Sequence, residues 1–287
     1  MKLAIGSAQF GLDYGVSNNA GKVSKQEVNK ILNIARKSGI NFIDTAITYG
    51  DSESSLGISG VSKFNIVSKL NSLDKRNKNI KEDIFQQINS SLYRLGVNSL
   101  YGVLIHDTKI LLADNGDQIY KALLGLKQQG LVKKIGISIY DTKELDNILS
   151  KFEVDIVQAP MNIFDQRLIS SGWNIKLKKM GIELHVRSVF LQGLLLMEPS
   201  ERPEYFNPWK DLLEKYDNWL TNEGFTNVEA CINSILQAEY VDKVVIGIES
   251  SEQLEEIIYL IGNKLIRIPA FLSSKDKSLI NPSMWEI

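Results

Sequence analysis

Short apolar runs rich in valine and isoleucine recur along the chain, and helical patterns of apolar and polar positions separate them. One helical pattern places Val28, Ile31, Leu32 and Ala35 on a single face, which is the spacing of an amphipathic helix. The apolar runs predict eight strands, near residues 3–7, 41–44, 64–69, 99–106, 132–138, 154–158, 182–187 and 243–246.

The alternation of strands and helices decides the fold class. Several predicted helices end at a glycine, as at Gly39, Gly96 and Gly130, where a left-handed residue is easily accommodated. Strands that alternate with helices are parallel and joined by right-handed crossovers, and eight such units close naturally into a barrel. Because no stretch is dominated by proline, glycine or like charge, the sequence predicts one α/β domain, a (β/α)8 TIM barrel over residues 1–287.

The longest gap between predicted strands, at about residues 191–242, predicts an insertion of loop and two helices. Loops of this length inside a compact domain are usually functional, and this one would leave the carboxyl face of the barrel. The alternative is that its aromatic residues only pack the loop onto the barrel, and the sequence favours neither. The aromatic and proline residues in question are Pro199, Pro203, Tyr205, Phe206, Pro208 and Trp209.

Composition limits the partners and the cellular compartment that we expect for the chain. The net charge of -1 gives no reason to expect a nucleic-acid partner. No apolar run approaches the roughly 20 residues that a membrane span needs, and the polar N-terminus predicts no secretory signal, so we expect a cytoplasmic protein. The only cysteine, Cys231, lies in an apolar helical pattern and is expected in the core.

Four polar residues fall at or near the carboxyl ends of predicted strands. Asp44 closes the second strand, Tyr49 follows on its loop, Lys69 closes the third and His106 the fourth. Taken singly, each has an ordinary explanation: a turn aspartate, a solvated lysine, a histidine with a satisfied place in the core. In a barrel, however, these strand ends converge on one site. The other histidine, His185, lies in the middle of a strand and is expected to be structural.

Residues 44–57 read Asp-Thr-Ala-Ile-Thr-Tyr-Gly-Asp-Ser-Glu-Ser-Ser-Leu-Gly. The stretch resembles the aldo-keto reductases, whose pattern is Asp-Thr-Ala-x-x-Tyr-Gly-x-Ser-Glu-x-x-Leu-Gly, and it meets every specified position. The resemblance implies that Asp44, Tyr49, Lys69 and His106 form the family's catalytic tetrad. No metal site is expected.

The chemistry of carbonyl reduction gives each tetrad residue a role. Tyrosine exchanges protons poorly near neutral pH unless a nearby ammonium stabilises the phenolate, which would be the part of Lys69. A buried lysine needs a carboxylate partner, which would be Asp44. His106 would donate a hydrogen bond to the substrate oxygen.

The resemblance extends to the nicotinamide end of a cofactor site. Gly6 begins a stretch similar to the family's opening loop, where small residues let the nicotinamide approach. Gln158 and Ser138 match family residues that contact the carboxamide, although Ile139 stands where the family has an asparagine.

The segment after the seventh strand resembles the loop near the cofactor pyrophosphate. Ser188 matches a family serine, and Phe190 and Gly193 follow on the same loop. Arg187 stands where many members have an aromatic residue that stacks on nicotinamide, and a planar guanidinium can stack similarly.

The last strand and the following helix resemble the part that binds adenosine and its 2′-phosphate. Gly247, Ser250, Gln253 and Glu256 belong to it, and the free N–H groups of the helix N-terminus are expected to face an anion. Glu249 adds a negative charge near the expected phosphate. The family favours NADP(H), which we therefore expect, with NAD(H) left open.

The reaction implied by the resemblance is reversible hydride transfer between this cofactor and a small-molecule aldehyde or ketone. The opening Gly-x-Ala-Gln-Phe-Gly-Leu-x-Tyr-Gly is similar to a bacterial subgroup linked to polysaccharide and nucleotide-sugar synthesis, which suggests a sugar-derived substrate. Two alternatives stay open: a slow, nicotinamide-bound sensor like the potassium-channel beta subunits, and another barrel enzyme such as a phosphate-sugar isomerase.

Overall fold

Eight parallel strands close into a barrel in the computed structural model, which describes residues 1–18, 20–73, 79–262 and 264–286. Each strand pairs with the next in sequence, and the last pairs with the first. The strands are β1 (Leu3–Gly6), β2 (Phe42–Asp44), β3 (Asn65–Leu70), β4 (Leu100–Ile105), β5 (Val132–Ser138), β6 (Ile156–Pro160), β7 (Glu183–Arg187) and β8 (Lys243–Gly247).

This topology confirms the predicted (β/α)8 barrel, and every predicted strand overlaps an observed one. The largest displacement is in β6, which starts at Ile156 rather than at Val154. Val154 is buried in the core ahead of the strand, so its apolar character lengthens the run of hydrophobic residues without lengthening the strand.

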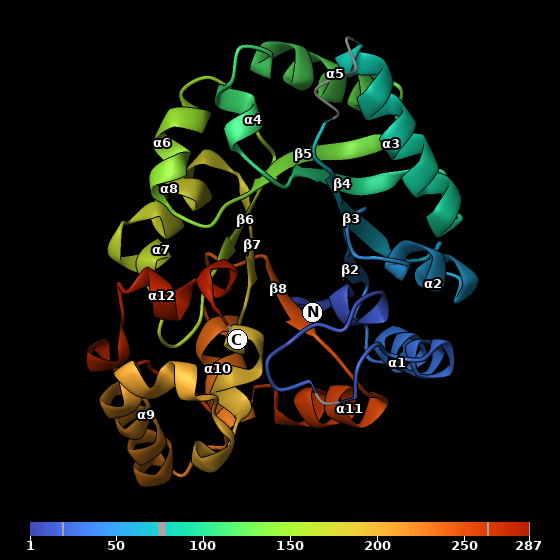
Figure 1. Cartoon of the computed structure of the whole chain (residues 1–287). Coiled ribbons are helices and arrows are strands. Elements are labelled where there is room, and N and C mark those ends of the chain that lie inside the picture. Colours follow the sequence, from blue (N-terminus) through green and yellow to red (C-terminus); the bar gives the residue numbers. More distant parts are fainter. Residues whose placement is uncertain (19, 74–78, 263, 287) are drawn as a thin grey trace.

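Helices surround the barrel, as Figure 1 shows. In α1 the predicted apolar face is buried, and Ser24 caps the first turn by accepting a hydrogen bond from the N–H of Glu27 (3.2 Å). Gly39, Gly96 and Gly130 have φ angles of 74°, 65° and 73°, as predicted for residues that end helices. The helices before β7 are α1 (Lys25–Lys37), α2 (Ser52–Ile58), α3 (Ile80–Leu95), α4 (Lys109–Leu112), α5 (Gly116–Gln128), α6 (Lys143–Leu149), α7 (Arg167–Ser170) and α8 (Trp173–Met180), with the short 3-10 helix η1 (Ala8–Phe10) after β1.

The segment between β7 and β8 packs against the C-terminal residues (Figure 1). Phe206 is buried and meets the ring of Trp285 with centroids 4.9 Å apart, and the indole N–H of Trp209 donates to Asp276 (2.9 Å). The aromatic residues therefore hold this segment to the rest of the chain. The elements are η2 (Leu191–Leu196), η3 (Pro199–Glu201), η4 (Glu204–Trp209), α9 (Lys210–Glu223) and α10 (Asn227–Leu236), then, after β8, α11 (Ser251–Leu260), η5 (Ala270–Leu272), α12 (Lys277–Ile280) and η6 (Pro282–Met284).

Cys231 lies in α10 and is fully buried, in agreement with the expected core position. Burial raises the pKa of its thiol to about 12, so the group stays protonated and unreactive at neutral pH. Among the described helices, none has the length and apolar character that crossing a bilayer would require.

A buried carboxylate fixes the helix that follows the tyrosine loop. Glu53, in the first turn of α2, is 2% exposed and accepts hydrogen bonds from Ser68 of β3 (2.8 Å) and Ser91 of α3 (2.6 Å). Arg94 of α3 donates to its other oxygen through Nε and Nη2, at 2.9 and 2.6 Å. One side chain thus ties α2 to a strand and to the neighbouring helix.

We predict that Glu53→Ala is strongly destabilising, because it leaves Arg94 and two buried hydroxyls without their acceptor. Removing one member of a buried ion pair typically costs about 3–5 kcal/mol. Urea unfolding should show this loss, whereas Glu214→Ala, which removes an exposed i,i+4 partner of Lys210, should change the free energy of unfolding by at most about 0.5 kcal/mol. Equal stabilities of the two variants would contradict the role of Glu53.

Candidate active site

A pocket of about 250 Å³ lies at the carboxyl ends of the strands, where barrel sites are built. This volume is slightly below the roughly 300–1,000 Å³ usual for small-molecule sites. All four predicted catalytic residues line it: Asp44, Tyr49, Lys69 and His106. The barrel therefore brings together side chains that are up to 62 positions apart in the sequence.

A buried ion pair forms the floor of the pocket. The ammonium of Lys69, 1% exposed, donates to Oδ2 of Asp44 (2.5 Å) and to the carbonyl of Thr45 (3.0 Å). Burial alone would lower the pKa of Lys69, but Asp44 and then Tyr49 outweigh it, so the pKa lies above its usual value. The other oxygen of Asp44 accepts from Nε2 of Gln158 (2.6 Å), so the carboxylate is held on both sides.

Tyr49 and His106 lie above this pair. The Lys69 ammonium is 4.9 Å from the centroid of the Tyr49 ring, and the rings of Tyr49 and His106 meet edge to face with centroids 6.3 Å apart. Burial, followed by the charges of Lys69 and Arg187, lowers the pKa of His106 to about 4. At neutral pH His106 is therefore an uncharged imidazole that can still donate one hydrogen bond.

The loop that carries Tyr49 is held against the start of the chain. The hydroxyl of Ser52, at the beginning of α2, lies within hydrogen-bond distance of two oxygens of Ser7. These are the main-chain carbonyl oxygen, at 2.9 Å, and the side-chain hydroxyl, at 2.8 Å. Gly11 lies so close that a Cβ there would be 1.9 Å from the carbonyl oxygen of Tyr49. Only glycine fits at that position, so the close contact helps to fix the tyrosine.

The comparisons with known proteins agree with this geometry. The model of the aldo/keto reductase family matches residues 2–266 of the chain. The chain belongs to this family.

Aldo-keto reductases are oxidoreductases that reduce carbonyl groups with a nicotinamide cofactor, and this chain shares that general chemistry. An aldo-keto reductase from Gibberella moniliformis is 26% identical over 235 residues, which cover 77% of this chain and 69% of the relative. The D-arabinose 1-dehydrogenase of Saccharomyces cerevisiae is 25% identical over 287 residues, 87% and 81% of the two chains.

Solved structures share the fold over almost the whole chain. The holo form of an aldo-keto reductase from Bacillus halodurans has a TM-score of 0.74 at 19% identity and covers 99% of this chain and 94% of its own. The glycerol dehydrogenase of Gluconobacter oxydans has a TM-score of 0.70 at 20% identity, with 92% and 87% covered.

The residues predicted to bind the cofactor of this reductase divide into two groups. Eight of them line the pocket, whereas Ser138, Gln158 and Ser250 lie outside its lining. The eight are Gly6, Arg187, Ser188, Phe190, Gly193, Gly247, Gln253 and Glu256.

Two buried polar atoms, on β5 and β6, fit the carboxamide of a nicotinamide. The hydroxyl of Ser138, 2% exposed, and Oε1 of Gln158, fully buried, have no hydrogen-bond partner. Buried polar atoms without a partner are rare and call for an explanation. A carboxamide offers one acceptor and two donors, which would satisfy a hydroxyl donor and an amide oxygen. The amide nitrogen of Gln158 also donates to Asp44, a contact that no local pattern in the sequence indicates.

At the N-terminus of α11 the structure differs from the expectation of free N–H groups. The N–H of Ser251 donates to the carboxylate of Glu27 on α1 (2.6 Å), and the N–H of Gln253 donates to the cap residue Ser250 (3.2 Å). These bonds to Ser251 lower the pKa of Glu27 to about 2, so it is charged. The helix end already holds an anion, and that anion is a side chain of the protein itself.

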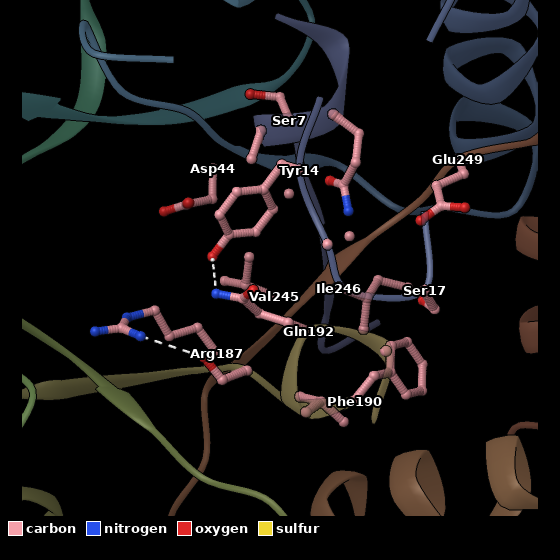
Figure 2. Close-up of a pocket in the computed structure, with 18 of the residues that line it drawn as sticks. Ser7, Tyr14, Ser17, Asp44, Arg187, Phe190, Gln192, Val245, Ile246 and Glu249 are labelled. Carbon is pink, nitrogen blue, oxygen red and sulfur yellow. Dashed lines mark hydrogen bonds between the residues drawn. The ribbon is translucent and has the colours of Figure 1, made fainter. Parts of the chain in front are cut away.

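A group of lining residues that the sequence did not indicate comes from the loop after β1. Tyr14 and Ser17 belong to it, and the loop also contacts η2: Gln192 donates from Nε2 to the hydroxyl of Tyr14 (3.1 Å), and its carbonyl accepts from the N–H of Val16 (2.9 Å). Figure 2 shows Tyr14 and Gln192 meeting across the pocket. No local sequence pattern predicts this contact, because it joins residues that are 178 positions apart.

Proposed function

We propose that this chain reversibly reduces an aldehyde or ketone to an alcohol, with Tyr49 as the group that supplies the proton. The observation that carries the proposal is the buried Asp44–Lys69 pair beside the Tyr49 ring. NAD(P)H, when bound, supplies the hydride. In the reverse direction Tyr49 would take the proton from the alcohol.

The four side chains divide the work on the substrate oxygen. His106, neutral because its pKa is near 4, donates a hydrogen bond that polarises the carbonyl and positions it next to the phenol. Tyr49 gives up its proton as the oxygen becomes an alcohol. The ammonium of Lys69 stabilises the phenolate that remains, and Asp44 keeps this ammonium charged and oriented.

The substrate that we propose is a small polyhydroxylated or sugar-derived carbonyl compound. One relative, 25% identical over most of its length, is named for the oxidation of D-arabinose. Hydroxyl groups of such a substrate would find polar partners around the tetrad, among them Tyr14, Gln192 and Tyr140, which all line the pocket.

Cofactor choice depends on the other end of the pocket. Family resemblance favours NADP(H), but the lining at β8 and α11 contains Glu249 and Glu256 and no lysine or arginine, and Glu27 occupies the N-terminus of α11. Carboxylates repel a 2′-phosphate and accept hydrogen bonds from the two hydroxyls of a ribose. The sequence predicts an NADP(H)-dependent reductase. We propose instead a cofactor preference that is shifted from NADP(H) toward NAD(H).

We predict that Glu249→Gln strengthens the binding of NADPH relative to that of NADH by about three- to tenfold at low salt. The change should be smaller at high salt, where the repulsion is screened. Fluorescence titration of the wild-type and variant proteins with NADH and NADPH measures both constants. Exposed Glu214→Gln serves as the control. An NADPH preference that is already strong in the wild type and unchanged in Glu249→Gln would contradict the proposal.

We predict that Tyr49→Phe lowers kcat by about 10² or more, since it removes the proton donor while preserving the ring. NAD(P)H affinity should stay near that of the wild type. Steady-state assays against a panel of aldehydes and ketones measure the effect, and Tyr93→Phe, at a tyrosine that is 89% exposed, should behave as the wild type. Near-normal turnover of Tyr49→Phe would refute the assignment.

A further inference from the structure

Arg187, at the end of β7, lies in the pocket without a carboxylate partner. Its Nη2 donates to the carbonyl of Ile139 (3.1 Å), its Nη1 to the hydroxyl of Ser188 (3.2 Å), and its guanidinium carbon is 4.4 Å from the centroid of the Tyr140 ring. No carboxylate of the described residues forms an ion pair with it. Among the other partly buried arginines, Arg94, Arg167 and Arg202 each pair with an Asp or Glu. Arg36 donates to Asn33 and to main-chain carbonyls, but it lies outside the pocket.

The contacts of Arg187 fix its orientation and leave donors free. A guanidinium has five N–H donors, and two are used here, so three remain. Because the Tyr140 ring stacks on the guanidinium, the free donors lie along the edge of the group. A partly buried cation without a counter-charge is costly, and a ligand anion would remove that cost.

Charges divide the pocket into a positive end and a negative end. Asp44 and Lys69 neutralise each other, and the other negative lining residues, Glu249 and Glu256, come from the β8–α11 end. Figure 2 shows Arg187 and Glu249 on opposite sides of the pocket, with Arg187 on the side of Asp44 and Tyr14. The catalytic end therefore carries an uncompensated positive charge.

Tyr14 offers a second donor at this end. Its oxygen accepts a hydrogen bond from Gln192, which leaves its own O–H free to donate. Burial of the hydroxyl, followed by the neighbouring Tyr49, raises the pKa of Tyr14 to about 12, although the side chain as a whole is 42% exposed at the pocket rim. The group is a donor throughout the physiological range.

We infer that Arg187 and Tyr14 form a subsite for an anionic group, a carboxylate or a phosphate, on the carbonyl substrate. The inference rests on the proposed reductase function and names the substrate class of that same site. It gives Arg187 a different role from the stacking on nicotinamide that the sequence suggests. Such an anion would accept charge-assisted hydrogen bonds from the guanidinium edge and the phenol while its carbonyl faces Tyr49 and His106.

The test compares substrates that differ in one charged group: 4-carboxybenzaldehyde with methyl 4-formylbenzoate, and glyceraldehyde 3-phosphate with glyceraldehyde. The wild type should favour an anionic member by about tenfold or more in kcat/KM, and the pair that shows the preference identifies the anion as carboxylate or phosphate. Arg187→Met should reduce the ratio of kcat/KM for the anionic member to kcat/KM for the neutral member by about 10- to 100-fold. Arg187→Lys should keep part of the preference, and Tyr14→Phe should lower it less than Arg187→Met.

Two controls make the result specific to the subsite. Lys210→Met removes a charge from an exposed side chain of α9 and should leave the ratio unchanged. The dissociation constant of NAD(P)H, from fluorescence titration, should be the same in the wild type and Arg187→Met. An unchanged ratio in Arg187→Met overturns the inference, and weakened cofactor binding with an unchanged ratio would assign Arg187 to the cofactor instead.

A binding measurement separates this inference from the reductase proposal. Calorimetry with NAD(P)H present can compare 4-(hydroxymethyl)benzoate with its methyl ester, and neither compound needs to react. If no aldehyde is reduced but the acid binds more tightly than the ester only in the wild type, the subsite stands and the proposed reaction fails. Glycerol 3-phosphate and glycerol are compared in the same way, and equal binding within both pairs to the wild type overturns the subsite.

Discussion

The candidate site depends on one buried ion pair, Asp44–Lys69, at the floor of the barrel mouth. An ammonium that is 1% exposed would be costly to bury alone, by several kcal/mol. The chain offsets that cost with a carboxylate oxygen at 2.5 Å and a main-chain carbonyl at 3.0 Å. The positive charge thereby stays directly below Tyr49, where a phenolate would form.

The surroundings of the pair are built to keep it rigid. Gln158 holds the second oxygen of Asp44, and Glu53 anchors the helix that follows the tyrosine loop. On the opposite side, Ser188, Leu191 and Gln192 have positive φ angles of 59°, 49° and 53°, which cost about 1–3 kcal/mol each. This strained backbone presents Gln192 to Tyr14 and brings Gly193 against Ser17, so the strain is located where the pocket is closed.

Much of the fold could be predicted from the sequence because its signals are local. Runs such as that of β4 are apolar from end to end, and a barrel requires the ends of such strands to meet. The tetrad could be predicted because residues 44–57 match the aldo-keto reductase pattern and each member lies within a few residues of a strand end. Contacts set only by tertiary packing could not. Glu27 meets α11 across 224 positions, and Gln158 meets Asp44 across 114, and neither contact leaves a periodic or spacing signal.

The central claim is that Asp44 and Lys69 act as one unit on Tyr49, and a double-mutant cycle on kcat tests it most directly. Asp44→Asn, Lys69→Met and the double variant are compared with the wild type, with circular dichroism to confirm that each is folded. Each single change should cost nearly the full effect, and the double variant little more, because either change removes the same charge from below the phenol. If the two losses instead add in free energy, the residues are not coupled and the account of the site is wrong.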